Sequence, residues 1–337
     1  MRKADLDVCR VLACMMVVLG HSGMLFWDFD PSATTWAVYN LLCVFLRSSV
    51  LLFFMVSGAL FLGRGKMDFL KQLKRAGHML VLYYVWSLIL NGIDALFLHY
   101  WSHGEPLLPL VLRGYFHLWF LPTMAMCYCA LPLLHGMLHQ NPENVRRGAI
   151  LLAAIVCVYA TLDAVPNKPE WLSALIAPYA FRYYRYFVMM PLGYVLYKQT
   201  LTKKQLTALG CAALAAILLI AFLNRRYAIS IGAASDALYE DMAISSVLTA
   251  CFIFCLCKHI ETLPPKLWGF VKLFSAASFG MYLMHPLFID AVRSRHFDLT
   301  QYSALWLYPL SYACFLLIPL GISWVMMKIP GLRKLVT

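Results

Sequence analysis

The chain is dominated by apolar runs of about twenty residues, and this feature constrains its fold more than any other. A helix needs about 20 apolar residues to cross the hydrocarbon core of a bilayer. Helices are favoured there because lipid offers no partners for backbone hydrogen bonds. The runs therefore predict an all-α, polytopic transmembrane bundle of about ten helices, near residues 6–27, 40–62, 78–98, 117–138, 148–165, 179–198, 206–224, 237–257, 273–292 and 303–327.

The composition leaves little room for any other architecture. Of the 337 residues, 62% are hydrophobic and 13% are charged, whereas about a quarter of an average soluble chain is charged. The segments between the runs are only as long as loops, so we expect one integral-membrane domain over residues 1–337. The first run follows a basic start but lacks a small-residue cleavage pattern, so we expect a retained helix and no signal peptide.

The distribution of charge predicts the orientation in the membrane. A net charge of +12 would suggest a nucleic-acid partner in a soluble protein, but here lysines and arginines gather in alternate loops. By the positive-inside rule these loops and both termini are cytoplasmic, and the expected surroundings are a lipid bilayer, with no nucleic acid. The basic loops lie near residues 2–3, 64–75, 146–147, 198–204, 258–272 and 328–334.

The eleven cysteines lie mostly inside apolar runs. They show no paired loop spacing and have no adjacent histidine. We interpret them as small buried side chains, and we expect neither disulfides nor a metal site.

Three ionisable residues interrupt the first apolar run, namely Asp7, Arg10 and His21. Each such group costs at least a few kcal/mol in lipid, so it normally faces a protein interior or a wet cavity. Eleven helical steps of about 100° separate Arg10 from His21, which places both on one face, roughly 16 Å apart along the axis. This run is the first candidate for a functional site.

The basic loop GRGKMDFLKQLKRAGH repeats cations at helical spacing. Lys71, Lys74, Arg75 and His78 are three or four residues apart, which puts them on one helical face at the predicted cytoplasmic surface. Such a face can attract anionic lipid headgroups. It can equally bind the phosphates of a cytosolic nucleotide cofactor.

The predicted outer side carries cations among aromatic residues. Arg47 can reach the interface or a site with equal ease, and His117 and Trp119 suit an interfacial belt or a cavity wall. Arg182 and Arg185 alternate with tyrosines, a pattern that suits a sugar or an anionic polymer as well as interfacial anchoring.

Two further groups of polar residues lie in later runs. Tyr282 and His285 precede Pro286 in mid-helix, where a proline leaves backbone groups that need partners. The acid pair Glu240 and Asp241 could orient a histidine, but the spacing does not select one.

Several motifs together resemble the acyltransferase-3 family of integral-membrane acyltransferases, especially its polysaccharide and lipopolysaccharide O-acetyltransferases. The order of the motifs along the helices makes the resemblance specific. They are Arg10 and His21 as R-x10-H with Asp7 before it, Arg47 with FFMVSG, HLWFL at 117–121, RYFVMMPLGYVLY at 185–197, and FGMYLMHP at 279–286.

One motif departs from the family pattern. The family often has R-x-x-R in the first basic loop, whereas this chain offers Lys71 with Lys74, or Arg75 with His78. Lysine and histidine keep much of the charge but lack the bidentate geometry of guanidinium. The cofactor role of these positions is therefore less secure than the roles of Arg10 and His21.

The resemblance implies transfer of an acyl group, most simply acetyl from acetyl-CoA, to a hydroxyl of a surface glycan or lipid-linked sugar. It implies a multi-pass protein of a bacterial inner membrane and no metal. His21 would be the base or a transient acyl carrier. Arg10 would bind the donor or stabilise the oxyanion, and Asp7 would orient it.

The other implied roles divide between the two substrates. The acyl-CoA phosphates would bind Lys71, Lys74, Arg75 and His78. The acceptor would bind Arg47, His117, Trp119, Arg182, Arg185, Tyr282 and His285.

A transporter or flippase of a lipid-linked sugar is the main alternative, and a scaffold in an envelope-synthesis complex is another. A transporter predicts related halves or helices interrupted at corresponding places, and the sequence shows neither. The acceptor, the acyl group and the oligomeric state are not set by the sequence.

Overall fold

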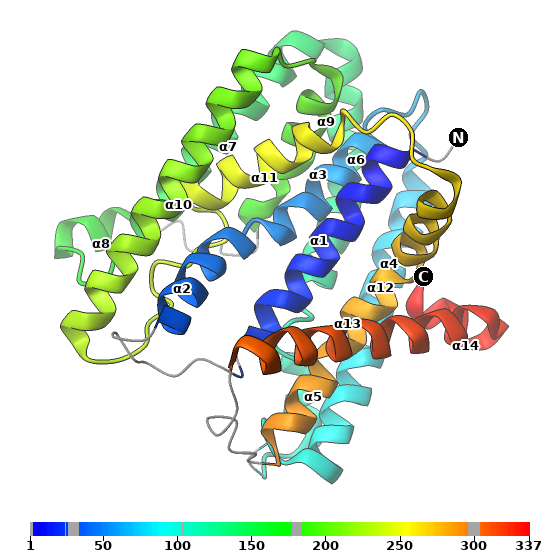
Figure 1. The fold of residues 1–337 in the computed structure, drawn as a ribbon. Helices are drawn as coiled ribbons and strands as arrows, with labels where there is room; N and C mark the ends of the chain where they lie inside the picture. Colours follow the sequence, from blue (N-terminus) through cyan, green and yellow to red (C-terminus); the bar gives the residue numbers. More distant parts are fainter. Residues whose placement is uncertain (1–2, 24, 26–33, 103, 177–183, 296–303) are drawn as a thin grey trace. The chain divides into compact units, whose positions relative to one another are not determined.

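The computed structural model describes residues 3–23, 25, 34–102, 104–176, 184–295 and 304–337. Within these ranges the chain forms helices and turns and no strand (Figure 1). Eight helices in the described residues are long and apolar enough to cross a membrane. The prediction of an all-helical transmembrane fold is therefore confirmed, while the orientation of the termini stays a prediction.

The helices follow one another along the chain with short connections. Their bounds are α1 (Ala4–Gly23), α2 (Thr34–Leu46), α3 (Ser49–Phe61), α4 (Phe69–Ile93), a π-helical turn η2 (Asp94–Leu98), α5 (Leu107–Arg113), α6 (Phe120–Gln140), α7 (Pro142–Asp163), α8 (Glu170–Ile176), a 3-10 turn η4 (Tyr184–Val188), α9 (Met189–Lys198), α10 (Lys203–Ile231), α11 (Ile244–Cys257), α12 (Pro265–Arg293), α13 (Ala304–Lys328) and α14 (Pro330–Val336).

Two of the ten expected spans are shorter in the structure. The run 179–198 contains the 10-residue α9 after η4, and the run 237–257 contains the 14-residue α11. Neither helix alone has the roughly 20 residues that a full crossing needs. The count of ten spanning helices is therefore not confirmed.

The second span is broken at Arg47 and Ser48, where a turn separates α2 from α3. The Ser48 hydroxyl donates to the Phe45 carbonyl at 2.7 Å, and the Ser48 N–H donates to the same oxygen at 3.3 Å. These bonds to the preceding turn replace the regular helical ladder. The single helix expected over 40–62 is therefore two helices, with Arg47 at the joint.

The contacts divide the chain into two compact units. Unit 1 comprises Met1–Gly20, Trp27–Gly65 and Gly136–Trp268, and unit 2 comprises His21–Phe26, Lys66–His135 and Gly269–Thr337. Helix α1 contributes its longer part to unit 1 and its last turn to unit 2. The expectation of a single domain stays a prediction.

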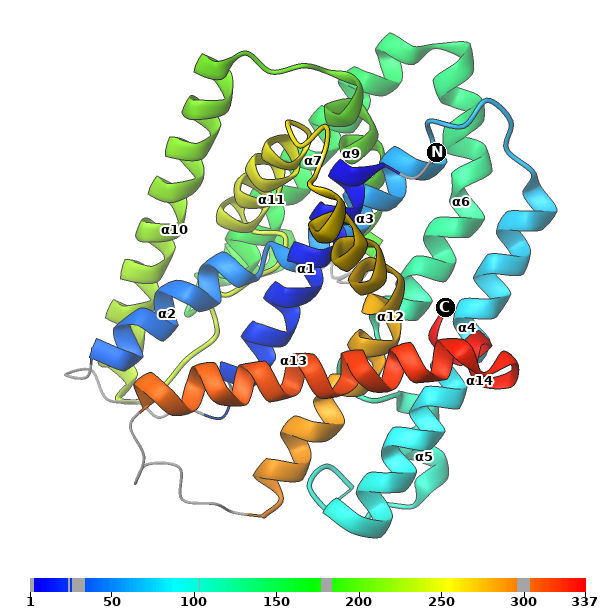
Figure 2. The ribbon, with the colours of Figure 1, turned by 45° about the vertical axis from the view of Figure 1, so that its right-hand side comes forward.

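In unit 1, helix α10 runs beside α11 and α2 (Figures 1 and 2). Buried amides tie α2 to α10. Asn40 donates to the Ala221 carbonyl at 2.8 Å, and its own side-chain oxygen accepts from Asn224 at 3.1 Å and from the Tyr239 hydroxyl at 2.5 Å. Such bonds hold apolar helices together where hydrophobic attraction between them is weak.

Helices α3 and α9 of unit 1 approach each other through two glycines. A Cβ on Gly58 would lie 1.9 Å from the Met190 carbonyl oxygen, and one on Gly193 would lie 2.4 Å from the Met55 backbone. Each glycine therefore makes room for the backbone of the other helix. The FFMVSG and PLGY sequences consequently serve packing at these two positions.

In unit 2, helix α4 packs on α5, and its Trp86 indole donates to the Leu335 carbonyl of α14 at 2.8 Å. The loop after η2 is ordered by the buried Asp94 carboxylate. It accepts from three consecutive backbone N–H groups, those of Tyr100, Trp101 and Ser102, at 2.7–3.2 Å. This loop holds Trp101 for the contacts described below.

Substitution of Gly193 by alanine is expected to destabilise unit 1, because the added methyl meets the Met55 backbone, which cannot rotate away. Overpacking of this kind costs about 1–3 kcal/mol. The matched control is Gly148→Ala in α7, where nothing lies within 4 Å of the added atom. That change should stabilise its helix by about 0.5–1 kcal/mol. Melting temperatures of the purified variants in detergent test this, and equal values for the two variants would refute the close approach.

Candidate functional site

Two of the predicted site histidines, His21 and His285, are in direct contact within unit 2. His21 lies in the last turn of α1, and His285 is fully buried in α12. The His21 Nδ1 atom is 2.7 Å from the His285 Nε2 atom. The other nitrogen of His285, Nδ1, is 2.8 Å from the Tyr282 carbonyl oxygen. A contact between residues 264 positions apart thus joins the two motifs.

The third histidine, His117, packs against the same pair just before α6. It is buried, and its Nε2 atom is 3.3 Å from the Leu283 carbonyl of α12. Its ring meets those of Tyr282 and His285 edge to face, at centroid distances of 5.3 and 5.6 Å. The Tyr282 hydroxyl donates to the His117 carbonyl. The structure therefore brings His21, His117, Tyr282 and His285 into one cluster, which we call the histidine cluster.

The histidine cluster does not have the arrangement of a metal centre. Among the described residues, no group of three or more His, Cys, Asp or Glu side chains is placed to hold a metal ion. The His21 and His285 nitrogens instead face each other at hydrogen-bond distance. Such an arrangement suits proton handling.

Aromatic residues that the sequence did not single out extend from this cluster. The ring of Phe116, 40% exposed, lies 5.7 Å from that of His21, and the ring of Trp101 lies 5.4 Å from that of Phe116. The buried Asp290 of α12 accepts from the Trp101 indole at 3.0 Å and from the Tyr115 hydroxyl at 2.7 Å. Burial and the Asp290 carboxylate raise the pKa of Tyr115 above its usual value, which keeps its hydroxyl a donor.

Asp290 could have been found in the sequence by the same argument that identified Arg10 and His21. It is an ionisable residue within an apolar run, and such residues are functional candidates by default. Trp101 and Phe116 gave no such signal, since isolated aromatic residues are common at membrane interfaces.

In unit 1, Asp7 and Arg10 form the expected local pair. The Arg10 Nη1 atom lies 3.2 Å from the Asp7 carboxylate, and Asp7 is buried while Arg10 is partly exposed. Helix α1 is continuous from Ala4 to Gly23, so Arg10 and His21 belong to one uninterrupted helix, as their spacing requires. Asp7 limits the directions in which the guanidinium can point.

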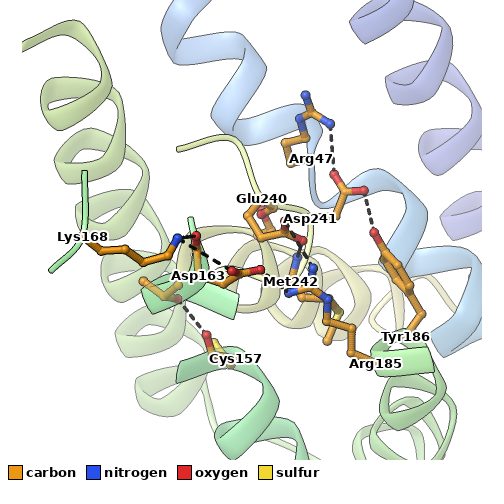
Figure 3. A network of polar contacts seen from close by, with 11 residues as sticks. Arg47, Cys157, Asp163, Lys168, Arg185, Tyr186, Glu240, Asp241 and Met242 are labelled. Carbon is orange, nitrogen blue, oxygen red and sulfur yellow. Dashed lines mark hydrogen bonds and ion pairs between the residues drawn. The ribbon is translucent and has the colours of Figure 1, made fainter. Parts of the chain in front are cut away.

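Also in unit 1, Arg47 and Arg185 belong to a network of acids and arginines (Figure 3). Asp241 lies between Arg47, at 3.4 Å, and the Tyr186 hydroxyl, which donates to it at 2.8 Å. Arg185 forms ion pairs with Glu240 at 3.5 Å and with Asp163 at 3.8 Å. The acid pair whose role the sequence left open thus forms ion pairs with the two arginines.

The two arginines differ in exposure. The Arg185 side chain is only 6% exposed, and a buried cation of this kind requires paired acids to offset its desolvation. The Arg47 side chain is 40% exposed and also lies 5.9 Å from the centre of the Tyr239 ring. Arg47 is therefore the more accessible of the two for a ligand.

The predicted cofactor residues are all on α4 in unit 2, but their surroundings differ. Lys71 and Lys74 are exposed, and Lys71 forms a 3.8 Å ion pair with Asp68. Arg75 donates to Gln72 at 3.0 Å, and His78 lies 3.2 Å from the Thr337 carbonyl oxygen. The two lysines thus present the most accessible charges of this set.

Two other predicted acceptor residues have different outcomes. Trp119 is half-buried and meets the Phe120 ring at 6.5 Å. Arg182 lies outside the described residues, as do Asp28 and Asp30 of the loop after α1.

Comparison with known proteins assigns the family. The family model described as an acyltransferase domain matches residues 3–328, which is nearly the whole chain. No curated protein shows significant similarity to the chain. The matched region includes both units and every residue of the histidine cluster. The chain therefore belongs to the acyltransferase-3 family and is a membrane acyltransferase built of helices.

Proposed function

We propose that the protein transfers an acyl group, acetyl in the simplest case, from cytosolic acyl-CoA to a hydroxyl of a cell-envelope glycan or lipid-linked sugar. The observation that carries this proposal is the hydrogen bond between His21 and the buried His285. A histidine held by a second neutral imidazole is equipped to take and return a proton. The expected location is a bacterial inner membrane, with the donor on the cytosolic side.

The reaction needs a base because a sugar hydroxyl does not ionise near neutral pH. Histidine, with an ordinary pKa of about 6.5, suits this role. The hydroxyl oxygen bonds to the thioester carbonyl carbon, and the carbon–sulfur bond then breaks. The hydroxyl proton passes to His21 and from there to the departing CoA thiolate. His21 as a transient acyl carrier is the alternative use of the same nitrogen.

Arg10 supplies positive charge to the donor. Its guanidinium is held by Asp7 and is partly exposed, so it can bind a pyrophosphate or stabilise the oxyanion of the transition state. Lys71 and Lys74, with Arg75 and His78 beside them, are the proposed ligands of the nucleotide phosphates.

The acceptor is proposed to meet the histidine cluster and its neighbours. His117, Tyr282 and Trp119 lie near or beside the proposed base, and Phe116 adds an exposed aromatic face. Arg47, Arg182 and Arg185 are the cations proposed for an acidic or phosphorylated acceptor, with Arg47 favoured by its exposure.

Replacement of His21 by alanine is expected to lower acyl transfer by about 10²- to 10⁴-fold, the contribution typical of a general base. Arg10→Ala is expected to lower it as well, with Arg10→Lys restoring part of the loss if charge matters more than geometry. The measurement is incorporation of labelled acetyl from acetyl-CoA into isolated envelope glycan by purified protein.

The matched control for His21 is His259→Ala. His259 also contacts a backbone carbonyl, that of Cys255 at 3.0 Å, and lies in unit 1. Full activity of both His21→Ala and Arg10→Ala would refute the mechanism. Sugar transport without any acetyl incorporation by the native protein would favour a transporter, and a labelled protein adduct at His21 would favour the acyl carrier.

Replacement of Lys71 and Lys74 together by glutamine is expected to raise the KM for acetyl-CoA and leave kcat unchanged. Loss of charged hydrogen bonds worth about 1.5 kcal/mol corresponds to a rise of roughly tenfold. The control is the double variant Arg146→Gln and Arg147→Gln on α7, an exposed basic pair that contacts Glu143. Equal KM values for the two double variants would assign the α4 lysines to lipid headgroups instead.

A further inference from the structure

His285 has a different role from the acceptor-binding one that the resemblance implied. Its side chain is fully buried, and both of its ring nitrogens are engaged within the protein. The His117 ring packs against it at a centroid distance of 5.6 Å. His285 therefore touches the proposed base and is not exposed to a substrate.

The hydrogen-bond partners of His285 fix which of its nitrogens carries the proton. A backbone carbonyl only accepts, so the Nδ1 atom beside the Tyr282 carbonyl must be the donor. In a neutral imidazole the other nitrogen, Nε2, then has the lone pair and accepts. His21 must therefore donate from Nδ1 in the 2.7 Å contact. The proton positions follow from the chemistry of the partners.

The two rings are arranged for this bond. Their planes differ by only 7°, with centroids 5.0 Å apart. A nitrogen–nitrogen distance of 2.7 Å is too short for a contact between ring faces, so the rings meet edge to edge in nearly one plane. The N–H of His21 consequently points along the lone pair of His285.

Pro286 explains why the Tyr282 carbonyl is available to His285. In a regular helix the N–H of residue 286 would donate to the carbonyl of residue 282. Proline has no N–H, so this carbonyl inside α12 loses its helical partner. The His285 side chain supplies the missing donor. The order His-Pro in the sequence thus fixes the tautomer of His285.

We propose that His285 is a positioning residue that holds His21 in the Nδ1–H tautomer and thereby presents the His21 Nε2 lone pair as the base. The inference rests on the proposed function of His21. When His21 takes the hydroxyl proton, both of its nitrogens carry hydrogen, and the bond to His285 disperses the new charge. Pro286 acts through His285 in the same sequence of bonds.

Three substitutions at His285 separate this role from simple packing. Glutamine can place a carbonyl oxygen near the position of Nε2, whereas asparagine reaches only the position of Nδ1, and leucine has no acceptor. We expect His285→Gln to keep kcat within a few-fold of the native value. His285→Asn and His285→Leu should lose between about 10-fold and 10⁴-fold, the upper limit being the whole contribution of the base.

The KM for acetyl-CoA should be unchanged in all three variants, because His285 does not meet the donor. Pro286→Ala tests the origin of the tautomer without removing any imidazole. It restores a backbone donor that competes for the Tyr282 carbonyl, so we expect a partial loss of kcat. Equal losses in the glutamine, asparagine and leucine variants, at native amounts of folded protein, would overturn the positioning role.

Nitrogen NMR gives a readout that does not depend on turnover. In protein labelled with 15N-histidine, the His21 signals, identified by their absence in His21→Gln, should show a protonated Nδ1 and an unprotonated Nε2. In His285→Leu the proton should shift toward Nε2, while His259→Leu should leave the His21 signals unchanged. A protonated Nε2 in the native protein would overturn the inference. An active His21→Ala variant would instead overturn the proposed function and leave the tautomer result standing.

Discussion

Hydrocarbon offers no hydrogen-bond partners, and this constraint determines where the polar side chains of the protein lie. Each ionisable residue within an apolar segment needs a partner from the protein itself. Asp7 pairs with Arg10, His21 bonds to His285, and Asp290 accepts from Trp101 and Tyr115. The polar groups are thus satisfied in small, separate sets, and each set fixes the direction of the side chains within it.

The two units use this constraint differently. In unit 1 the arginines are held by carboxylates, as in the pairing of Arg185 with Glu240, while glycines let α3 and α9 meet backbone to backbone. In unit 2 the central polar contact joins two histidines, with aromatic rings around them. Paired charges suit the binding and holding of anions, whereas linked imidazoles suit the movement of a proton.

The local features of this protein could be predicted from its sequence, because helix geometry sets them. The apolar runs gave the spanning helices, and the three-residue offset gave the contact of Asp7 with Arg10. The break at Arg47 was not predictable in this way, since the run around it is apolar on both sides. Hydrophobic length alone also could not show that α9 and α11 are short.

The candidate site depends on contacts between distant parts of the chain, and periodicity says little about these. The sequence marked His21 and His285 separately, but only the fold shows that they meet, and it also brings Asp241 to Arg47. Even so, the proline after His285 carried local information. It indicated an unpaired carbonyl in mid-helix, and the structure shows which side chain bonds to it.

The pairing of two histidines has a physical advantage over the use of a carboxylate in the same place. In serine proteases a buried aspartate fixes the tautomer of the catalytic histidine. A carboxylate within a membrane-spanning bundle would bring a large desolvation cost and would need further donors to offset it. A neutral imidazole fixes the tautomer through one donor and one acceptor and adds no charge while the base is unprotonated. The nearby acid of α12, Asp290, has its own donors in Trp101 and Tyr115, so the proposed base can depend on a neutral partner.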